Sequence, residues 1–421
     1  MPRPQRFARL PLPLVVTCLL LAAAARARAQ GAASPAPVVS RNAGGTRLLS
    51  GANYDLGFSG AALFGYESNY TYTVDPHVTG SPLVVGELGI SYQHRLSPRL
   101  ALRAGLAAVA RVPTANARLV EFTIEVPAIL TIRLSSLVEL WVTNHFGTQQ
   151  SRTPPVFLGT EAITGRQAGT IRFSSLHDTL QPMVYVRLGT SFGVELGPYA
   201  RIKQVNFLEN PVGFEPDYRI HDVGVTAAGR YELGDRFTAR LLYDLGKRWF
   251  ANYEARPPGR NPQETTALGM LRHAMGLRLG VRVVGQLRLQ GAYSLRIHRD
   301  NGGYFDSLGH VVEGGVGYSI PDRLQIYAGA QFLSRRYTSR TPCEAQPVGP
   351  QGPFAGSDCR GPQRALQVLE EAYLGASARV TVFITRWIQA IASYEIADAE
   401  ADAWNPTKPN HRILGGVGSS L

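Results

Sequence analysis

The chain has 421 residues, a formal net charge of +12 and a mean hydropathy of −0.07, with 44 glycines and 18 tyrosines. Beyond the N-terminal segment no run approaches about eighteen consecutive apolar residues, which excludes helical membrane spans. The positive charge is not concentrated in one tail, so the sequence gives little support to nucleic-acid binding.

The N-terminus has the features of an export signal. Arg3, Arg6 and Arg9 form a basic start, an apolar stretch follows, and Ala27-Arg28-Ala29 has the small-x-small form of a cleavage site. Removing residues 1–29 takes away five arginines and no acidic residue, so the formal charge falls from +12 to +7. The chain therefore divides into a signal peptide (1–29), a flexible lead-in or small plug (30–55), and a barrel (56–421).

Strict alternation of apolar and polar residues dominates the rest of the chain and is clearest in residues 237–297. There Phe237, Ala239 and Leu241 alternate with Thr238 and Arg240. Period two predicts strands with one apolar and one polar face. These runs are about twice as long as the usual five or six residues of a strand. The pattern predicts sixteen strands, at 60–72, 84–94, 99–112, 119–133, 138–146, 180–188, 194–203, 222–233, 236–250, 271–283, 287–298, 312–320, 324–337, 372–383, 387–397 and 412–421.

The connections alternate between short turns and long loops. This asymmetry is typical of an all-β transmembrane antiparallel barrel, with short periplasmic turns and longer extracellular loops. We expect about 16 strands, within a range of 14–18. The aperiodic segment 147–179 is predicted to be the longest extracellular loop. A β-propeller fits less well, because each hairpin has two long strands and no repeated motif.

On its signal, alternation and turn asymmetry, nearly the whole mature chain resembles Gram-negative outer-membrane β-barrel proteins of the porin-like kind. No specific family is indicated. The resemblance implies an outer-membrane location, contact with outer-membrane lipid, and handling by the barrel-insertion machinery. Such proteins often end in an aromatic residue, whereas this chain ends in Leu421. A homo-oligomer remains an open alternative, and no nucleic-acid partner is expected.

A barrel of this size encloses more space than side chains can fill, so its default interior is a water-filled channel. Its polar-face arginines have two interpretations. They could attract and orient anions, or they could pair with acids on neighbouring strands and hold the wall together. The arginines predicted to line the pore are Arg103, Arg187, Arg201, Arg230, Arg240, Arg278, Arg282, Arg288 and Arg296.

The sequence contains few residues that indicate a covalent, metal-binding or catalytic site. Cys343 and Cys359 lie in a Pro/Gly-rich stretch and are expected to form a disulfide in an oxidising compartment. No metal site, cofactor or catalytic residue is predicted, and His145 is expected on the inward face. The sequence therefore indicates a non-enzymatic outer-membrane channel for passive or weakly selective diffusion of small solutes, with a leaning towards anions. The alternative is a non-transporting barrel with a structural or secretion-associated role.

Overall fold

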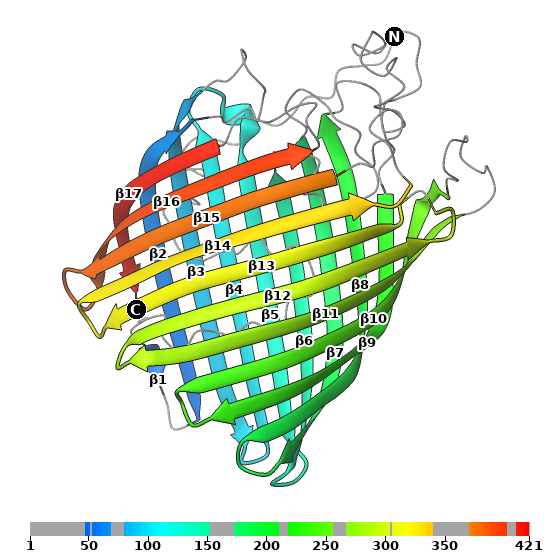
Figure 1. Cartoon of the computed structure of the whole chain (residues 1–421). Helices are drawn as coiled ribbons and strands as arrows, with labels where there is room; N and C mark the ends of the chain where they lie inside the picture. Colours follow the sequence, from blue (N-terminus) through cyan, green and yellow to red (C-terminus); the bar gives the residue numbers. More distant parts are fainter. Residues whose placement is uncertain are drawn as a thin grey trace.

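The protein forms one closed, antiparallel β-sheet (Figure 1). In this computed structural model, the residues described are 47–50, 53–68, 80–151, 172–209, 218–255, 267–303, 305–339, 370–401 and 410–420. The elements are β1 (Arg47–Ser50), β2 (Tyr54–Glu67), β3 (Ser81–Ser97), β4 (Leu100–Pro113), the 3-10 helix η1 (Ala117–Leu119), β5 (Glu121–Arg133), β6 (Val138–Ser151), β7 (Arg172–Leu188), β8 (Phe192–Glu209), β9 (Tyr218–Leu233), β10 (Phe237–Glu254), β11 (Ala267–Val284), β12 (Leu287–Asp300), β13 (Ser307–Ile320), β14 (Leu324–Tyr337), β15 (Glu370–Phe383), β16 (Ile388–Ala401) and β17 (Asn410–Ser420).

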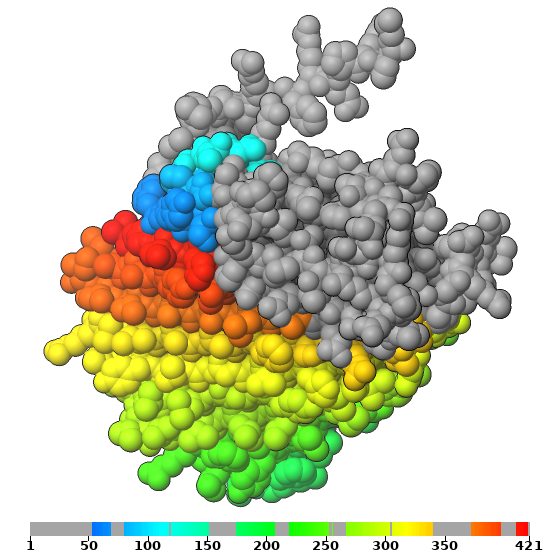
Figure 2. All heavy atoms as spheres, turned by 45° about the horizontal axis from the view of Figure 1, so that its top comes forward, coloured from blue at the N-terminus to red at the C-terminus, as the bar shows by residue number. Residues whose placement is uncertain are grey.

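Strands β2 to β17 make the wall, each hydrogen-bonded to the next in chain order, and β17 pairs back with β2. In Figure 2 the strands lie as bands in chain order, with the blue bands of β2 and β3 beside the red band of β17. The sixteen-stranded closed barrel predicted from the alternation is confirmed. In the described part of the chain, no helix is long and apolar enough to cross a membrane.

Several predicted strand ends were wrong, most clearly those around residues 147–179. The segment 147–179 is not a continuous loop, because β6 runs on to Ser151 and β7 begins at Arg172. Pairs such as Thr148 with Leu176, and Gln149 with Ser175, continue the ladder there. Beyond the apolar zone polar residues occur on both faces of a strand, so the alternation fades although the hydrogen bonds continue.

Strand β1 lies within the segment expected to be a lead-in and was not predicted. It pairs with the start of β2, through Leu49 opposite Leu56 and Ser50 opposite Asp55. The pairing of β17 with β2 begins beyond this point, at Ser59 opposite Ser420. Strand β1 therefore covers the part of the β2 edge that β17 leaves unpaired, which removes an open sheet edge.

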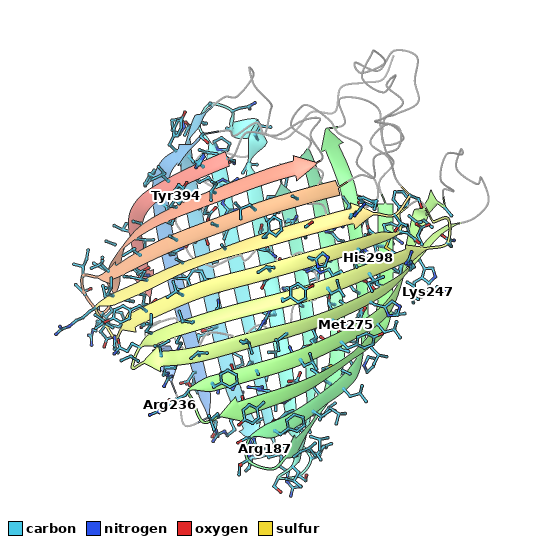
Figure 3. The ribbon with its side chains drawn as sticks, viewed as in Figure 1. Arg187, Arg236, Lys247, Met275, His298 and Tyr394 are labelled. Carbon is cyan, nitrogen blue, oxygen red and sulfur yellow. The ribbon has the colours of Figure 1, made fainter. Side chains whose placement is uncertain are left out.

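The seven short turns lie together at one end of the barrel, here called the short-turn end; the opposite end is the long-loop end. Gly189 and Gly234 occupy such turns with φ of 91° and 57°, a backbone region that side chains other than glycine rarely adopt. An arginine lies in or within three residues of every short turn, and Figure 3 labels two of them, Arg187 and Arg236. The others are Arg99, Arg133, Arg288, Arg323 and Arg386.

The outer face of the wall is apolar and carries a belt of tyrosine–histidine hydrogen bonds. Tyr243, Tyr293 and Tyr394 are each the seventh residue of their strand, on β10, β12 and β16. Each hydroxyl bonds the Nδ1 of a histidine on the next strand, at 2.8 Å, 2.9 Å and 2.7 Å. Figure 3 shows Tyr394 and Met275 on this wall. The histidines are His273, His310 and His411.

Candidate functional site

The interior of the barrel is identified by side chains that meet over intervening strands. Arg379 on β15 donates two hydrogen bonds of 2.9 Å to the carboxylate of Glu87 on β3. Strands β16, β17 and β2 lie between them in the sheet order, so the pair bridges the concave side of the wall. Beneath the pair lie Leu63, Ile391 and Gly416, which are register partners across β2, β17 and β16. This face of every strand is the inner face, and it carries most of the charge.

The register places all nine predicted arginines on the inner face. Several pair with acids: Arg240 with Glu195, Arg230 with Glu232, and Arg282 with Asp235. The contact between Arg278 and Glu313 is longer, at 3.9 Å. For these four positions the wall-holding interpretation of the sequence describes the geometry better than a free ladder of cations.

A buried charge network surrounds Asp222 on β9, whose side chain is 0% exposed. In the register Asp222 lies opposite Arg201 on one side and Arg248 on the other. Its Oδ2 accepts a 3.1 Å hydrogen bond from Arg248 and another from Arg272, which reaches over from β11. Three cations therefore converge on one carboxylate. Alternation predicts all three on the polar face, but only Arg201 was among the arginines predicted to line the pore.

A second network closes the seam between β17 and β2. Arg412 donates a 2.8 Å hydrogen bond to Glu67, and its other nitrogens lie 3.3 Å from Glu121 and 3.5 Å from Glu395. Glu67 also accepts a 2.6 Å hydrogen bond from Asn410. The last strand is thus bound by charge to β2, β5 and β16. Sequence reasoning missed Arg412, because nothing in the alternation shows which distant strands it meets.

The inner face changes character along the barrel axis. Towards the short-turn end Arg103, Arg187 and Arg288 are exposed, and among the described residues no acid pairs with them. Exposure on the inner face means contact with the interior water. These three side chains therefore form a hydrated cationic zone, here called the cationic vestibule.

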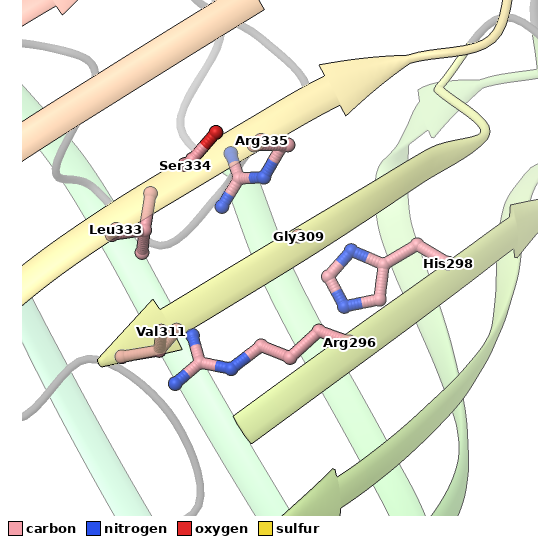
Figure 4. Close-up of a pocket in the computed structure, with 7 residues that line it drawn as sticks. All are labelled: Arg296, His298, Gly309, Val311, Leu333, Ser334 and Arg335. Carbon is pink, nitrogen blue, oxygen red and sulfur yellow. The ribbon is translucent and has the colours of Figure 1, made fainter. Parts of the chain in front are cut away.

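Towards the long-loop end the inner face is packed and includes large apolar side chains. Leu63, Phe250 and Leu268 are fully buried, with Met270 and Tyr337 nearly so. A small hollow remains between β12, β13 and β14, where Gly309 leaves a gap between two arginines (Figure 4). It is lined by Arg296, His298, Gly309, Val311, Leu333, Ser334 and Arg335.

The remaining predictions from the sequence concern the cysteine pair and His145. Cys343 and Cys359 lie outside the described residues, so their disulfide stays a prediction. His145 lies on the inner face, where its Nε2 is 2.6 Å from Glu125 Oε2. Asn144, its neighbour, lies on the outer face and donates a 2.8 Å hydrogen bond to Asp178.

No family model matches the chain, and no curated protein does. Among solved structures, it is similar to the outer membrane channel DcaP of Acinetobacter baumannii, at 10% identity and a TM-score of 0.43, over 90% of this chain and 99% of that one. It is also similar to CdiB from Escherichia coli, at 9% identity and a TM-score of 0.47, over 86% of this chain and 62% of CdiB. OprB of Pseudomonas putida matches at 10% identity and a TM-score of 0.39, over 87% of this chain and 94% of OprB.

At these identities the comparisons describe a shared barrel shape and carry no argument about activity. The chain's own wall is more informative, since a closed sheet with an apolar outer face satisfies every condition for crossing a membrane with strands. The protein is accordingly an outer-membrane-type β-barrel of sixteen antiparallel strands, and no specific family is indicated.

Proposed function

We propose that the protein is an outer-membrane channel for the diffusion of small solutes, with a preference for anions. The observation that carries this proposal is the cationic vestibule of Arg103, Arg187 and Arg288, three exposed guanidinium groups on the inner face. Charge on a pore wall decides which ions enter, and a cationic wall concentrates anions.

The charges around the vestibule support a net positive pore wall, and with it the preference for anions. Three acids at the short-turn end have cationic partners: Asp235 pairs with Arg282, Glu232 with Arg230, and Glu139 with Arg133 at 3.3 Å. Such pairs contribute little net field at a distance. The uncompensated charge of the vestibule is therefore positive, and arginine keeps this charge at every pH of interest.

The test is ion selectivity in planar lipid bilayers under a salt gradient. We expect an anion-selective reversal potential for the wild type and a shift towards cations when Arg103, Arg187 and Arg288 are all replaced by Ala. A matched control compares R288Q with R299Q, because Arg299 is exposed and pairs with Asp306 on the outer side of the wall. A cation-selective wild type, unchanged in the triple variant, would refute the anion preference.

A non-transporting barrel is the second candidate, and the packed long-loop half favours it. Buried apolar residues such as Leu63 and Phe250 on the inner face are unusual for a wide aqueous pore. A structural or secretion-associated role would need no open passage. The same bilayers distinguish the two functions, since a non-transporting barrel inserts without stable conductance.

Export through a cleaved signal peptide belongs to the same proposal. N-terminal sequencing of protein recovered from outer membranes should begin at Gln30. Assembly into a homo-oligomer is a further option, and the mass of the detergent-solubilised protein by light scattering tests it.

A further inference from the structure

Three side chains with metal-binding atoms converge on the inner wall of strands β5, β6 and β7. Glu125, Gly147 and His177 are direct register partners across these strands, and His145 lies two residues from Gly147. His145 Nε2 is 2.6 Å from Glu125 Oε2, and His177 Nε2 is 3.4 Å from the same oxygen. The ligand atoms of all three residues lie within 4.8 Å of one another.

Gly147 provides the space for this convergence. A Cβ at this position would lie 2.4 Å from both Glu125 Oε2 and His177 Cε1. Any side chain would therefore enter the volume on which the two imidazoles and the carboxylate converge. A metal ion needs an open volume of this kind between its ligands.

The shared carboxylate oxygen is buried and lies between the two histidines. Both Nε2 atoms approach Glu125 Oε2 at ion-pair distance, although neither contact has the geometry of a full hydrogen bond. The two rings lie nearly perpendicular, with centroids 5.3 Å apart and an interplanar angle of 78°. Two imidazole nitrogens and a carboxylate oxygen within 4.8 Å of one another form an arrangement that a cation can complete in place of the protons.

We propose that Glu125, His145 and His177 bind a divalent transition-metal ion of the zinc class on the inner wall. Two imidazoles and one carboxylate suit Zn²⁺, whereas Ca²⁺ and Mg²⁺ require mostly oxygen ligands. Ligand distances of about 2.0–2.2 Å require only a small outward movement of His145 from the carboxylate. With three protein ligands, one coordination position remains open towards the lumen, where water or an anion can bind.

Nearby positive charge moderates the affinity. Lys203 lies opposite His177 in the register, and Arg201 donates a 3.2 Å hydrogen bond to the neighbouring Thr179. The positive charges of Lys203 and Arg201 repel a bound metal ion and lower its affinity, so the site is expected to bind zinc reversibly.

The test is calorimetric titration of the EDTA-treated, refolded full chain in detergent with Zn²⁺. The optical spectrum of bound Co²⁺ then reports the coordination. We expect one zinc ion per chain and at least tenfold weaker binding in each of H145Q, H177Q and E125Q. The matched control is H310Q, because His310 lies on the outer face and bonds Tyr293.

Two further variants keep the result interpretable. Because thiolates also bind zinc, the double variant C343S/C359S should bind as tightly as the wild type. Heat-dependent electrophoretic mobility checks that each variant has a folded barrel. Absence of zinc binding in the wild type, or equal binding in a folded H145Q/H177Q double variant, overturns the proposal. The measurement reads binding and not transport, so its outcome is independent of whether the barrel conducts.

Discussion

Replacing Asp222 with Asn should destabilise the barrel more than any comparable change of one surface charge. The carboxylate is fully buried, and Arg248 and Arg272, which bond it, have side chains only 7% and 11% exposed. The amide keeps the size of the side chain but removes the buried charge that both guanidinium groups bond. Breaking a buried ion pair from one side leaves an uncompensated charge, which costs about 3–5 kcal/mol.

The matched control is Asp235→Asn. Asp235 also bonds an arginine, Arg282, but its side chain is 69% exposed, so water replaces much of the interaction. The expected cost is below about 1 kcal/mol. Both variants can be unfolded with guanidinium chloride in lipid vesicles and followed by tryptophan fluorescence. If the free energy of unfolding of D222N lies within about 1 kcal/mol of that of D235N, the network around Asp222 does not hold the wall together as we describe.

Three further predictions concern other parts of the wall. Gly147→Ala should abolish zinc binding in the calorimetric titration, because its Cβ enters the ligand volume; retained affinity would contradict the site geometry. Replacing Tyr243, Tyr293 and Tyr394 with Phe leaves three histidine nitrogens unpaired against lipid and should cost about 0.5–1.5 kcal/mol each in vesicle unfolding. A triple variant as stable as the wild type would show that the belt contributes nothing. Arg379→Ala removes the side chain that bridges three strands, so single-channel conductance should rise, and an unchanged conductance would place this bridge outside the conducting path.

The architecture could be predicted because a barrel wall separates two solvents. A side chain such as Leu241 faces lipid, whereas its neighbour Arg240 faces the interior, and this difference is visible in the sequence as period two. The number of strands followed from the same signal. Where both faces of a strand leave the apolar zone, as at residues 147–151, the signal ends before the strand does.

The charge networks could not be predicted, because they depend on the stagger between strands. Alternation places Asp222 and Arg272 on the inner face, but only the register brings a β11 arginine over β10 to a β9 carboxylate. The proposed zinc-class site could not be predicted for the same reason, because its residues meet only through the strand register. Glu125 and His145 lay on the polar faces of neighbouring predicted strands, whereas His177 fell in a segment assigned to a loop.

The tyrosine–histidine belt also sets a length. His273 lies opposite Leu245, which is eight residues beyond the start of β10 at Phe237. At about 3.3 Å per residue and a strand tilt of roughly 35–45°, the apolar zone below the histidines is about 20 Å tall. Exposed apolar side chains continue beyond the histidines on the same face, among them Trp249, Leu271 and Leu308, so the apolar band extends past the belt towards the typical height of about 25 Å. The barrel should therefore match an outer-membrane bilayer without thinning it, and it should unfold at lower denaturant concentration in lipids with longer acyl chains.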